Sequence, residues 1–191
     1  MKKVLLMLAD GFEEVEALTV VDYLRRMDIS CETCSIKEGN KVKGAHEIIV
    51  EADAVLRDIK NTEDYDGVIL PGGLPGSSNL RDDERVINLI RELNKDRKLV
   101  AAICAAPIVL ERAGIIDGKD VTSYPGCEGE LKSANYSEEL VVVDGNVITA
   151  RGPAVAVYFA LKIVEYFVGK TSANQLKEDI LLDMVEKKVG H

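Results

Sequence analysis

The sequence predicts an α/β fold, a doubly wound sandwich in which helices flank a mostly parallel central sheet. Short apolar runs alternate along the chain with longer segments of helical spacing, and strands that alternate with helices pair in parallel. Several of these runs are continuously apolar, as expected for strands buried on both faces. With 191 residues and no linker, repeat or low-complexity segment, residues 1–191 are expected to form one domain.

The first half of the chain opens with a buried strand and a helix. Residues 4–8 are all apolar, and the segment 13–27 places its apolar residues on one side of a helix. A second strand is expected at 29–36. Residues 42–50 then form either a hairpin or an excursion from the sheet.

The middle of the chain repeats this alternation twice. Residues 67–70 form the third buried strand, and apolar residues recur at helical spacing over 82–95. Residues 99–103 form the fourth strand. A short helix over 105–113 follows and ends at Gly114, a residue typical of helix C-termini.

The last third is expected to complete the sheet and cover it. Residues 121–124 form a short strand, and 140–150 form a β-hairpin because the Asp144-Gly145 turn permits positive φ. Two closing helices are expected at 153–168 and 173–188. Sites in such folds form at the carboxyl ends of the strands, so the strand ends at Gly11, Gly72 and Cys104 are expected to meet in one crevice.

Cys104 is the first candidate for chemistry. It lies at the turn between a buried strand and a helix, where free backbone N–H groups and the helix dipole favour a thiolate. Such sites lower a cysteine pKa from about 8.5 to roughly 3.5–7.5. The alternative is a buried structural thiol, the usual role of a free cysteine.

Glu16 is the second candidate. It lies in the first turn of the first helix with apolar neighbours on both sides, which would press its carboxyl toward the crevice. A buried carboxyl has a raised pKa and, when protonated, donates a hydrogen bond to a thiolate. The alternative is a solvated glutamate that offsets the helix dipole, as Glu13 and Glu14 do.

The glycine-rich segment 71–76 offers backbone N–H groups beside a strand end, as stabilisation of an oxyanion requires. A mere turn would use the same glycines. A phosphate loop is disfavoured because Gly-Lys-Ser/Thr is missing.

The other three cysteines and the two histidines give little support for a disulfide or a metal site. Cys31 and Cys34 lie three apart in a predicted strand, face opposite sides and are expected to pack rather than form a disulfide. Cys127 is either a resolving thiol or an incidental loop cysteine. His46 lies in the segment after the second strand, and the terminal residue His191 is expected to fray. Neither histidine has a second ligand at useful spacing, so no metal site is expected.

Composition excludes other classes of partner. The formal net charge of −9 argues against binding to nucleic acid or to an anionic membrane, which leaves a small molecule as the expected ligand. The first apolar run is too short for a signal peptide and no stretch is long enough to span a bilayer. A cytoplasmic protein with four reduced thiols is therefore expected.

Four motifs follow one another along the chain. They are Gly11-Phe12-Glu13-Glu14-Val15-Glu16-Ala17, Val68-Ile69-Leu70-Pro71-Gly72-Gly73, Ala101-Ala102-Ile103-Cys104-Ala105-Ala106-Pro107 and Thr149-Ala150-Arg151-Gly152-Pro153. In this order they resemble the ThiJ/PfpI superfamily, in its DJ-one and YajL branch. The resemblance extends from the first strand to the helix after residue 153.

The resemblance implies a flavodoxin-like sandwich, usually a homodimer, that works without a cofactor. It implies that Cys104 is the reactive cysteine of a nucleophile elbow and that Glu16 hydrogen-bonds to it. It also implies that Gly72, Gly73 and the Ala105 amide surround the thiol. Members are described as glyoxalases that convert methylglyoxal to lactate, as deglycases, and as peroxide sensors or chaperones, with protease or amidase as older descriptions.

The chain departs from the family pattern near the thiol. Protease-like members carry histidine directly after the cysteine, where this chain has Ala105, and the DJ-one branch has a histidine at the position of Tyr124. His46 stands where that branch has an arginine, which would alter an anion site shared with Arg151 and with Arg25 or Arg26.

Three functional hypotheses follow. The first is a 2-oxoaldehyde glyoxalase or deglycase in which the Cys104 thiolate adds to the aldehyde and Glu16 moves protons, with Tyr124 on the adjacent carbonyl. The substrate is then a small reactive aldehyde or a glycated compound. The second is a thiol redox sensor or chaperone without turnover. The third and least favoured is an amidase or protease that uses His46 as its base.

Overall fold

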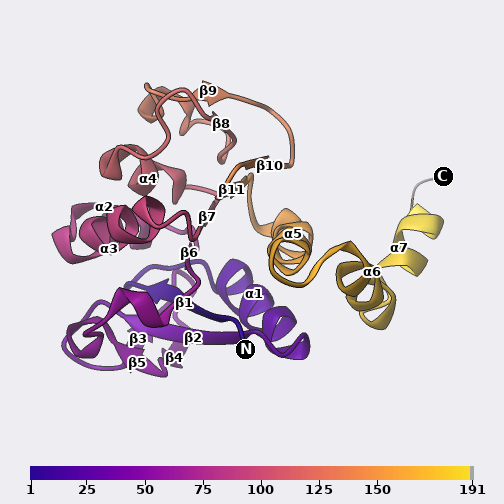
Figure 1. The fold of residues 1–191 in the computed structure, drawn as a ribbon, viewed down its shortest axis with the longest axis horizontal. Coiled ribbons are helices and arrows are strands. Elements are labelled where there is room, and N and C mark those ends of the chain that lie inside the picture. Colours follow the sequence, from indigo (N-terminus) through magenta and orange to yellow (C-terminus); the bar gives the residue numbers. More distant parts are fainter. Residues whose placement is uncertain (190–191) are drawn as a thin grey trace.

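The computed structural model describes residues 1–189 and shows a seven-stranded sheet with helices on both faces (Figure 1). The strands run in the order β10-β11-β7-β6-β1-β2-β5. Their bounds are β1 Lys3–Leu8, β2 Ser30–Ser35, β5 Ala54–Val55, β6 Gly67–Leu70, β7 Leu99–Ile103, β10 Val141–Asp144 and β11 Val147–Ala150.

Neighbouring strands from β11 to β5 pair in parallel, and β10 pairs antiparallel with β11. The five longer parallel strands lie in the order second, first, third, fourth, fifth, which is the flavodoxin-like arrangement. The predicted α/β fold with a mostly parallel sheet is confirmed.

Helices cover the two faces of this sheet. Their bounds are α1 Glu14–Arg26, α2 Gly76–Asp82, α3 Glu84–Lys95, α4 Pro107–Ala113, α5 Ala156–Val168, α6 Lys170–Asp179 and α7 Leu182–Val189. Helices α1 and α5 pack on one face, and α2, α3 and α4 lie on the other (Figure 1).

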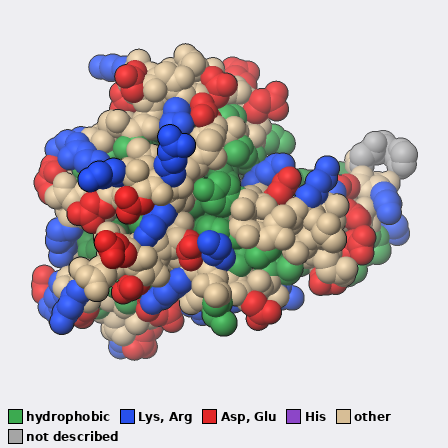
Figure 2. Space-filling view, in the orientation of Figure 1, with side chains coloured by type: hydrophobic (Ala, Val, Ile, Leu, Met, Phe, Trp, Pro, Cys, Tyr) green, Lys and Arg blue, Asp and Glu red, His purple; other side chains and the backbone are tan. Residues whose placement is uncertain are grey.

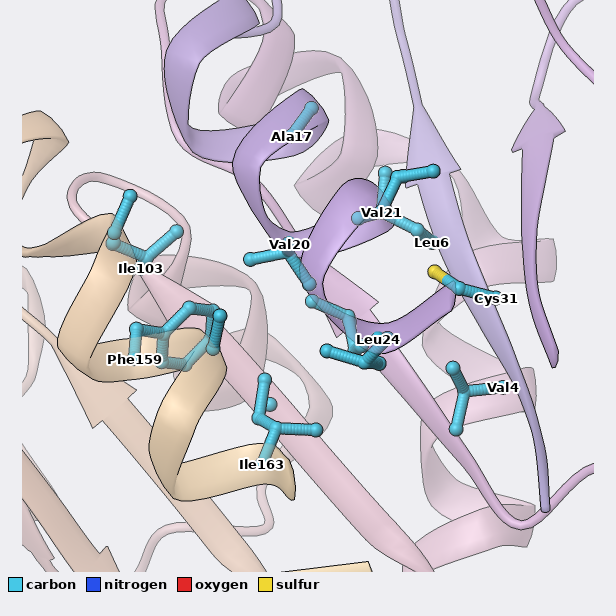
Figure 3. Packing of buried hydrophobic residues seen from close by; sticks show 14 of the residues in the cluster. Val4, Leu6, Ala17, Val20, Val21, Leu24, Cys31, Ile103, Phe159 and Ile163 are labelled. Carbon is cyan, nitrogen blue, oxygen red and sulfur yellow. The ribbon is translucent and has the colours of Figure 1, made fainter. Parts of the chain in front are cut away.

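Each face buries its own hydrophobic cluster. Along β1, Leu6 joins the cluster under α1 and α5, whereas Leu5 joins the cluster under α3 and α4. Figure 3 shows side chains of α1 and α5, among them Leu24 and Phe159, packed in the first cluster. Cys31 belongs to the first cluster and Cys34 to the second, so these thiols lie on opposite faces of β2, as predicted.

In three regions outside the buried strands, the structure decides between predicted alternatives, shortens a predicted strand or confirms a predicted hairpin. Residues 42–50 belong to a hairpin, formed by β3 (Lys41–Lys43) and β4 (Ile49–Glu51). The strand expected at 121–124 shortens to β8 (Asp120–Val121), which pairs with β9 (Asn135–Tyr136) outside the main sheet. The hairpin expected at 140–150 is present as β10 and β11, and its Gly145 has a φ of 63°.

Helix ends differ from the predictions in several places. The helix expected over 105–113 begins at Pro107, and the one expected over 153–168 begins with a 3₁₀ turn, so that α5 starts at Ala156. The helix expected over 82–95 is α3, preceded by the separate α2, because Asp83 is extended and caps α3 with its side chain. The helix expected over 173–188 is divided between α6 and α7, since Leu181 has a φ of 62° that a continuous helix does not allow. Gly114 ends α4 in the left-handed conformation, as predicted.

The described part of the chain also contains four short 3₁₀ helices, at Leu56–Asp58, Thr62–Asp64, Glu128–Glu130 and Pro153–Val155. Helices α6 and α7 extend away from the sheet beyond α5 (Figure 1). In the same view, hydrophobic side chains gather beside α5, and charged side chains are spread over the rest of this face (Figure 2). No helix within residues 1–189 combines the length and the apolar character needed to cross a lipid bilayer. His191 lies outside the described residues.

Candidate active site

The site forms where the carboxyl ends of β6, β7 and β11 meet the start of α1. The amide of Cys104 donates to the carbonyl of Ala150 at 2.8 Å, and the amide of Tyr124 donates to the carbonyl of Cys104 at 2.8 Å. The amide of Gly72 donates to the Glu16 carboxyl at 2.8 Å. The predicted convergence of separate turns on one site is therefore present.

Cys104 occupies a sharp turn with a strained backbone. Its φ of 66° lies in the left-handed region, which a non-glycine residue adopts only when the surrounding structure enforces it. The residue is 9% exposed, so the thiol borders the surface without protruding from it. This is the geometry of a nucleophile elbow, in which a strained turn between strand and helix presents one side chain.

Glu16 is fully buried beneath Cys104. Its Oε2 accepts the Gly72 hydrogen bond, and its carboxyl also hydrogen-bonds with the Cys104 thiol. Within residues 1–189 the other oxygen, Oε1, has no hydrogen-bond partner. Burial raises the pKa of Glu16 from 4.5 to about 7, against the opposing effect of its hydrogen bonds. An unpartnered oxygen with a pKa near neutrality can accept and return a proton.

The pKa of the Cys104 thiol is raised rather than lowered. Burial is the largest cause and the adjacent Glu16 carboxylate is the second, whereas hydrogen bonds from the Ala105 and Gly73 amides act in the opposite direction. The predicted lowering fails for a structural reason. Helix α4 begins only at Pro107, and the nearest charge is an acid. The resting pair is thus a thiol beside a carboxyl that can take its proton.

Gly72 and Gly73 are required by close packing of the backbone. A Cβ on Gly72 would lie 2.5 Å from the Cβ of Cys104 and 2.6 Å from Oε2 of Glu16. Gly73 has a φ of 87°, and a Cβ there would lie 2.4 Å from the amide nitrogen of Glu13. Because no side chain fits, the backbone N–H groups approach the reactive side chains directly.

Tyr124 lies at the rim of the site. It is 50% exposed, and its ring lies close to Gly152, where an added Cβ would be 3.2 Å from the ring. Cys127 follows three residues later and is partly buried, with a pKa raised by burial. Its side chain packs against the hydrophobic cluster under α3 and α4, and its role as a resolving thiol stays a prediction.

The predicted anion site is not assembled within one chain, because each of its residues binds a different partner. The Arg151 guanidinium donates to the carbonyl of Glu138 at 2.8 Å. Arg25 and Arg26 lie in the last turn of α1 and pair with Asp53 and Asp22.

His46 contacts two carboxylates instead. Its Nδ1 lies 2.9 Å from Oε2 of Glu14 and 3.7 Å from Oε1 of Glu13. These neighbours raise the pKa of His46. The sequence offered no sign of this cluster, since His46 lies more than thirty residues from both glutamates. Within residues 1–189 the His46 ring hydrogen-bonds to Glu14, and the amidase hypothesis, in which His46 reaches Cys104 from a neighbouring subunit, stays a prediction.

Several surface cavities lie away from Cys104. One of about 520 Å³ lies at the amino ends of β1 and β2 and is lined by Lys3, Arg25 and Cys31 among others. Apart from Arg25, which was considered for the anion site, none of its lining residues belongs to the predicted site. The shallow exposure of Cys104 therefore favours a small reactant over a large buried ligand.

Comparison with known proteins identifies the family of this chain. The sequence matches the DJ-1/PfpI family over residues 2–166. The chain belongs to this family. Its resemblance to ThiJ/PfpI proteins, inferred from four motifs, is thereby confirmed.

Two relatives within the DJ-1/PfpI family align over nearly the whole chain. Protein dj-1beta of Drosophila melanogaster is 39% identical over 184 residues, which cover 95% of this chain and 97% of the relative. The Parkinson disease protein 7 homolog of Danio rerio is 38% identical with the same coverage.

Solved structures of the DJ-1/PfpI family share the fold. The crystal structure of Drosophila melanogaster DJ-1beta matches with a TM-score of 0.90 at 38% identity, over 94% of this chain and 97% of that one. Oxidized Toxoplasma gondii DJ-1 matches with a TM-score of 0.89 at 30% identity, over 95% and 98%. The chain is thus a DJ-1-like protein of a family that includes enzymes.

Proposed function

We propose that this protein is a cysteine-dependent glyoxalase or deglycase that acts on small 2-oxoaldehydes or glycated compounds without a cofactor. The observation that carries the proposal is the buried Glu16 carboxyl in hydrogen-bond contact with the Cys104 thiol, with two backbone amides on the same sulfur. This arrangement unites a nucleophile, a proton carrier and oxyanion donors.

The first step is addition of Cys104 to the aldehyde. The sulfur forms a bond to the aldehyde carbon, Glu16 takes the thiol proton, and the aldehyde oxygen gains a proton to give a hemithioacetal. The Gly73 and Ala105 amides stabilise negative charge on that oxygen as the bond forms. Glu16 suits the role of base because its pKa of about 7 matches neutral pH.

The second step moves hydrogen between the two carbons. Glu16 removes the proton from the former aldehyde carbon, the hydroxyl on that carbon passes its proton to the adjacent carbonyl oxygen, and the adjacent carbon is then protonated. One carbon is thereby oxidised and the other reduced. The product is a thioester of Cys104. Water hydrolyses this thioester, releases the 2-hydroxy acid and restores the thiol. We assign the contact with the second carbonyl to Tyr124, which is half-exposed and whose amide bonds to the Cys104 carbonyl.

Lactate formation from methylglyoxal tests the proposal. We expect turnover by the purified protein, loss of turnover in Cys104→Ala, and a fall of at least about a hundredfold in Glu16→Gln, since general acid–base catalysis contributes about 10²–10⁴-fold. Cys127→Ala serves as the matched control and should retain turnover. Activity that survives in Cys104→Ala would refute the assignment of the nucleophile.

A thiol redox sensor is the second candidate. It is favoured by the partial exposure of Cys104 beside a carboxyl that can hydrogen-bond to an oxidised sulfur. A family relative, Toxoplasma gondii DJ-1, has been solved in an oxidized form. Mild peroxide should then add two oxygens to Cys104 before Cys31, Cys34 or Cys127, as measured by mass spectrometry of peptides. Equal oxidation of all four thiols would remove this candidate.

We also propose a homodimer in which exposed apolar residues of α1 and the β3–β4 hairpin meet a second copy. Val15 and Leu18 on α1, with Ile48 and Ile49 beside β4, are each at least 40% exposed. The patch is continuous because the Ile48 amide hydrogen-bonds to Glu14, the neighbour of Val15. Sedimentation should show a dimer for the native chain and a monomer for Val15→Asp combined with Ile49→Asp. A native monomer would contradict this arrangement.

A further inference from the structure

We propose that Glu13, Glu14 and His46 form a binding site for a divalent transition-metal ion, with Zn²⁺ as the best fit. One ligand atom from each residue lies within 4.8 Å of the other two. Two carboxylate oxygens and an imidazole nitrogen are a ligand set that zinc uses in proteins. The site shares no ligand with the Cys104 site and does not depend on the proposed activity.

The distances suit a small ion. Zinc binds nitrogen and oxygen at about 2.0–2.2 Å in tetrahedral geometry, so neighbouring ligand atoms lie about 3.3 Å apart. The observed separations from Nδ1 of His46 are 2.9 Å to Glu14 and 3.7 Å to Glu13, which bracket that value. Small side-chain rotations would bring all three atoms to bonding distance.

The carboxylates are held in place before any ion binds. The side chain of Glu14 is 5% exposed, and its carboxylate accepts hydrogen bonds from the amides of His46 and Ile48. The loop is built around this group, because a Cβ on Gly44 would lie 2.2 Å from Oε1 of Glu14. Backbone hydrogen bonds from Gly11 to Lys43 and from Ala45 to Phe12, both of 2.8 Å, fix the loop against the start of α1.

The charge balance favours a cation. Two carboxylates face a single imidazole, and among residues 1–189 the Glu13 carboxylate makes no hydrogen bond even though its side chain is only 15% exposed. Buried charges in proteins are usually paired or bound to metal. In the single chain the His46 side chain is 68% exposed, so the ion has room for a fourth ligand, either a water or a group of the second copy.

The sequence separation explains why this site was not predicted. His46 lies more than thirty residues from both glutamates, and only the packing of the β3–β4 hairpin on α1 brings the three together. The sequence predicted no metal site because no second ligand lies near His46 along the chain. This proposal replaces that prediction.

Zinc titration of the Cys104→Ser protein tests the site without interference from the active-site thiol. Calorimetry should detect one ion per chain, and Co²⁺ should give visible absorption without the strong sulfur charge-transfer band of thiolate ligation. Glu13→Gln and His46→Gln should each weaken binding at least about tenfold. Glu13 is the sharper variant, because its carboxylate makes no hydrogen bond that folding requires.

Matched controls identify the ligands. The chain has two histidines, so His191→Gln should bind zinc like the parent, and NMR spectra of the imidazole nitrogens should show zinc perturbing His46. Circular dichroism checks that each variant is folded. Unchanged affinity in His46→Gln, or absence of binding at millimolar zinc, would overturn the proposal and leave His46 and Glu14 as an ion pair only.

Discussion

At the scale of single residues, the reactivity of Cys104 depends on Glu16. The two groups share a buried contact, so their protons are lost in steps that belong to the pair. The first proton leaves near pH 7, and the singly charged pair then contains a fraction in which the proton lies on Glu16 and the charge on sulfur. That fraction is the form that attacks an electrophile.

The pH dependence of Cys104 alkylation measures this sharing. We expect the rate with iodoacetamide, followed at Cys104 by peptide mass spectrometry, to rise with a midpoint near pH 7 in the native protein. In Glu16→Gln the step near pH 7 should vanish, since only the thiol with its burial-raised pKa remains. Asp22→Asn, an exposed position on the same helix, is the control. A step that persists in Glu16→Gln would assign it to Cys104 alone.

Gly72 contacts both Cys104 and Glu16 so closely that a larger residue there would affect both stability and catalysis. Gly72→Ala should lower the free energy of unfolding by about 1–3 kcal/mol and abolish turnover, because the new methyl group overlaps both Cys104 and Glu16. Urea denaturation and the lactate assay measure the two effects. Gly39→Ala, which has open space around it, should change neither. A fully active Gly72→Ala would show that the contact relaxes freely.

At the scale of elements, the residues at the two ends of α4 determine where this helix after Cys104 begins and ends. Pro107 starts α4 without requiring an N–H donor, and Gly114 ends it with a left-handed φ of 71°. Sequence signals of this kind are local, which is why the end at Gly114 and the turn at Gly145 were predicted correctly.

Gly114→Ala isolates the cost of that helix end. Because nothing lies within 4 Å of the new methyl group, the effect is backbone strain alone, and we expect a loss of about 1 kcal/mol in the free energy of unfolding. Gly129→Ala also adds a methyl group in open space but without a positive φ, and it should be nearly neutral. Equal stability of the two variants would argue against strain at Gly114.

At the scale of the whole molecule, the active site costs stability as pH rises. Glu16 has a pKa of about 7 in the folded state and an ordinary value of 4.5 when unfolded. The folded state therefore binds more protons between these values, and stability falls as pH increases through this window. Asp10, Asp53 and Asp66 act oppositely. Their lowered pKa values stabilise the fold above their ordinary value of 3.8, and this stability is lost as pH falls.

Glu16→Gln should remove the loss of stability that Glu16 causes as pH rises. Relative to the native protein, we expect the variant to gain on the order of 2 kcal/mol in the free energy of unfolding between pH 5 and pH 8. Chemical denaturation at the two pH values measures this difference. Parallel changes in both proteins would mean that Glu16 ionises in the folded state as it does in the unfolded chain.

The sequence by itself determined the α/β class, most strand and helix positions and the residues around the thiol. Apolar periodicity, glycine turns and motif order are local signals, and Cys104, Glu16, Gly72 and Gly73 each belong to one. The family followed from the same motifs. The division of the last helix at Leu181 escaped this reasoning because its positive φ has no glycine to announce it.

Only the tertiary structure decided the electrostatics. Whether the thiol has a raised or lowered pKa depends on burial and on the distance to Glu16, which lies 88 residues earlier in the chain and which no spacing rule specifies. The same holds for His46, whose neighbours are set by how the β3–β4 hairpin packs on α1. Local sequence patterns identify the candidate residues, whereas long-range packing sets the pKa, and therefore the charge, of each side chain.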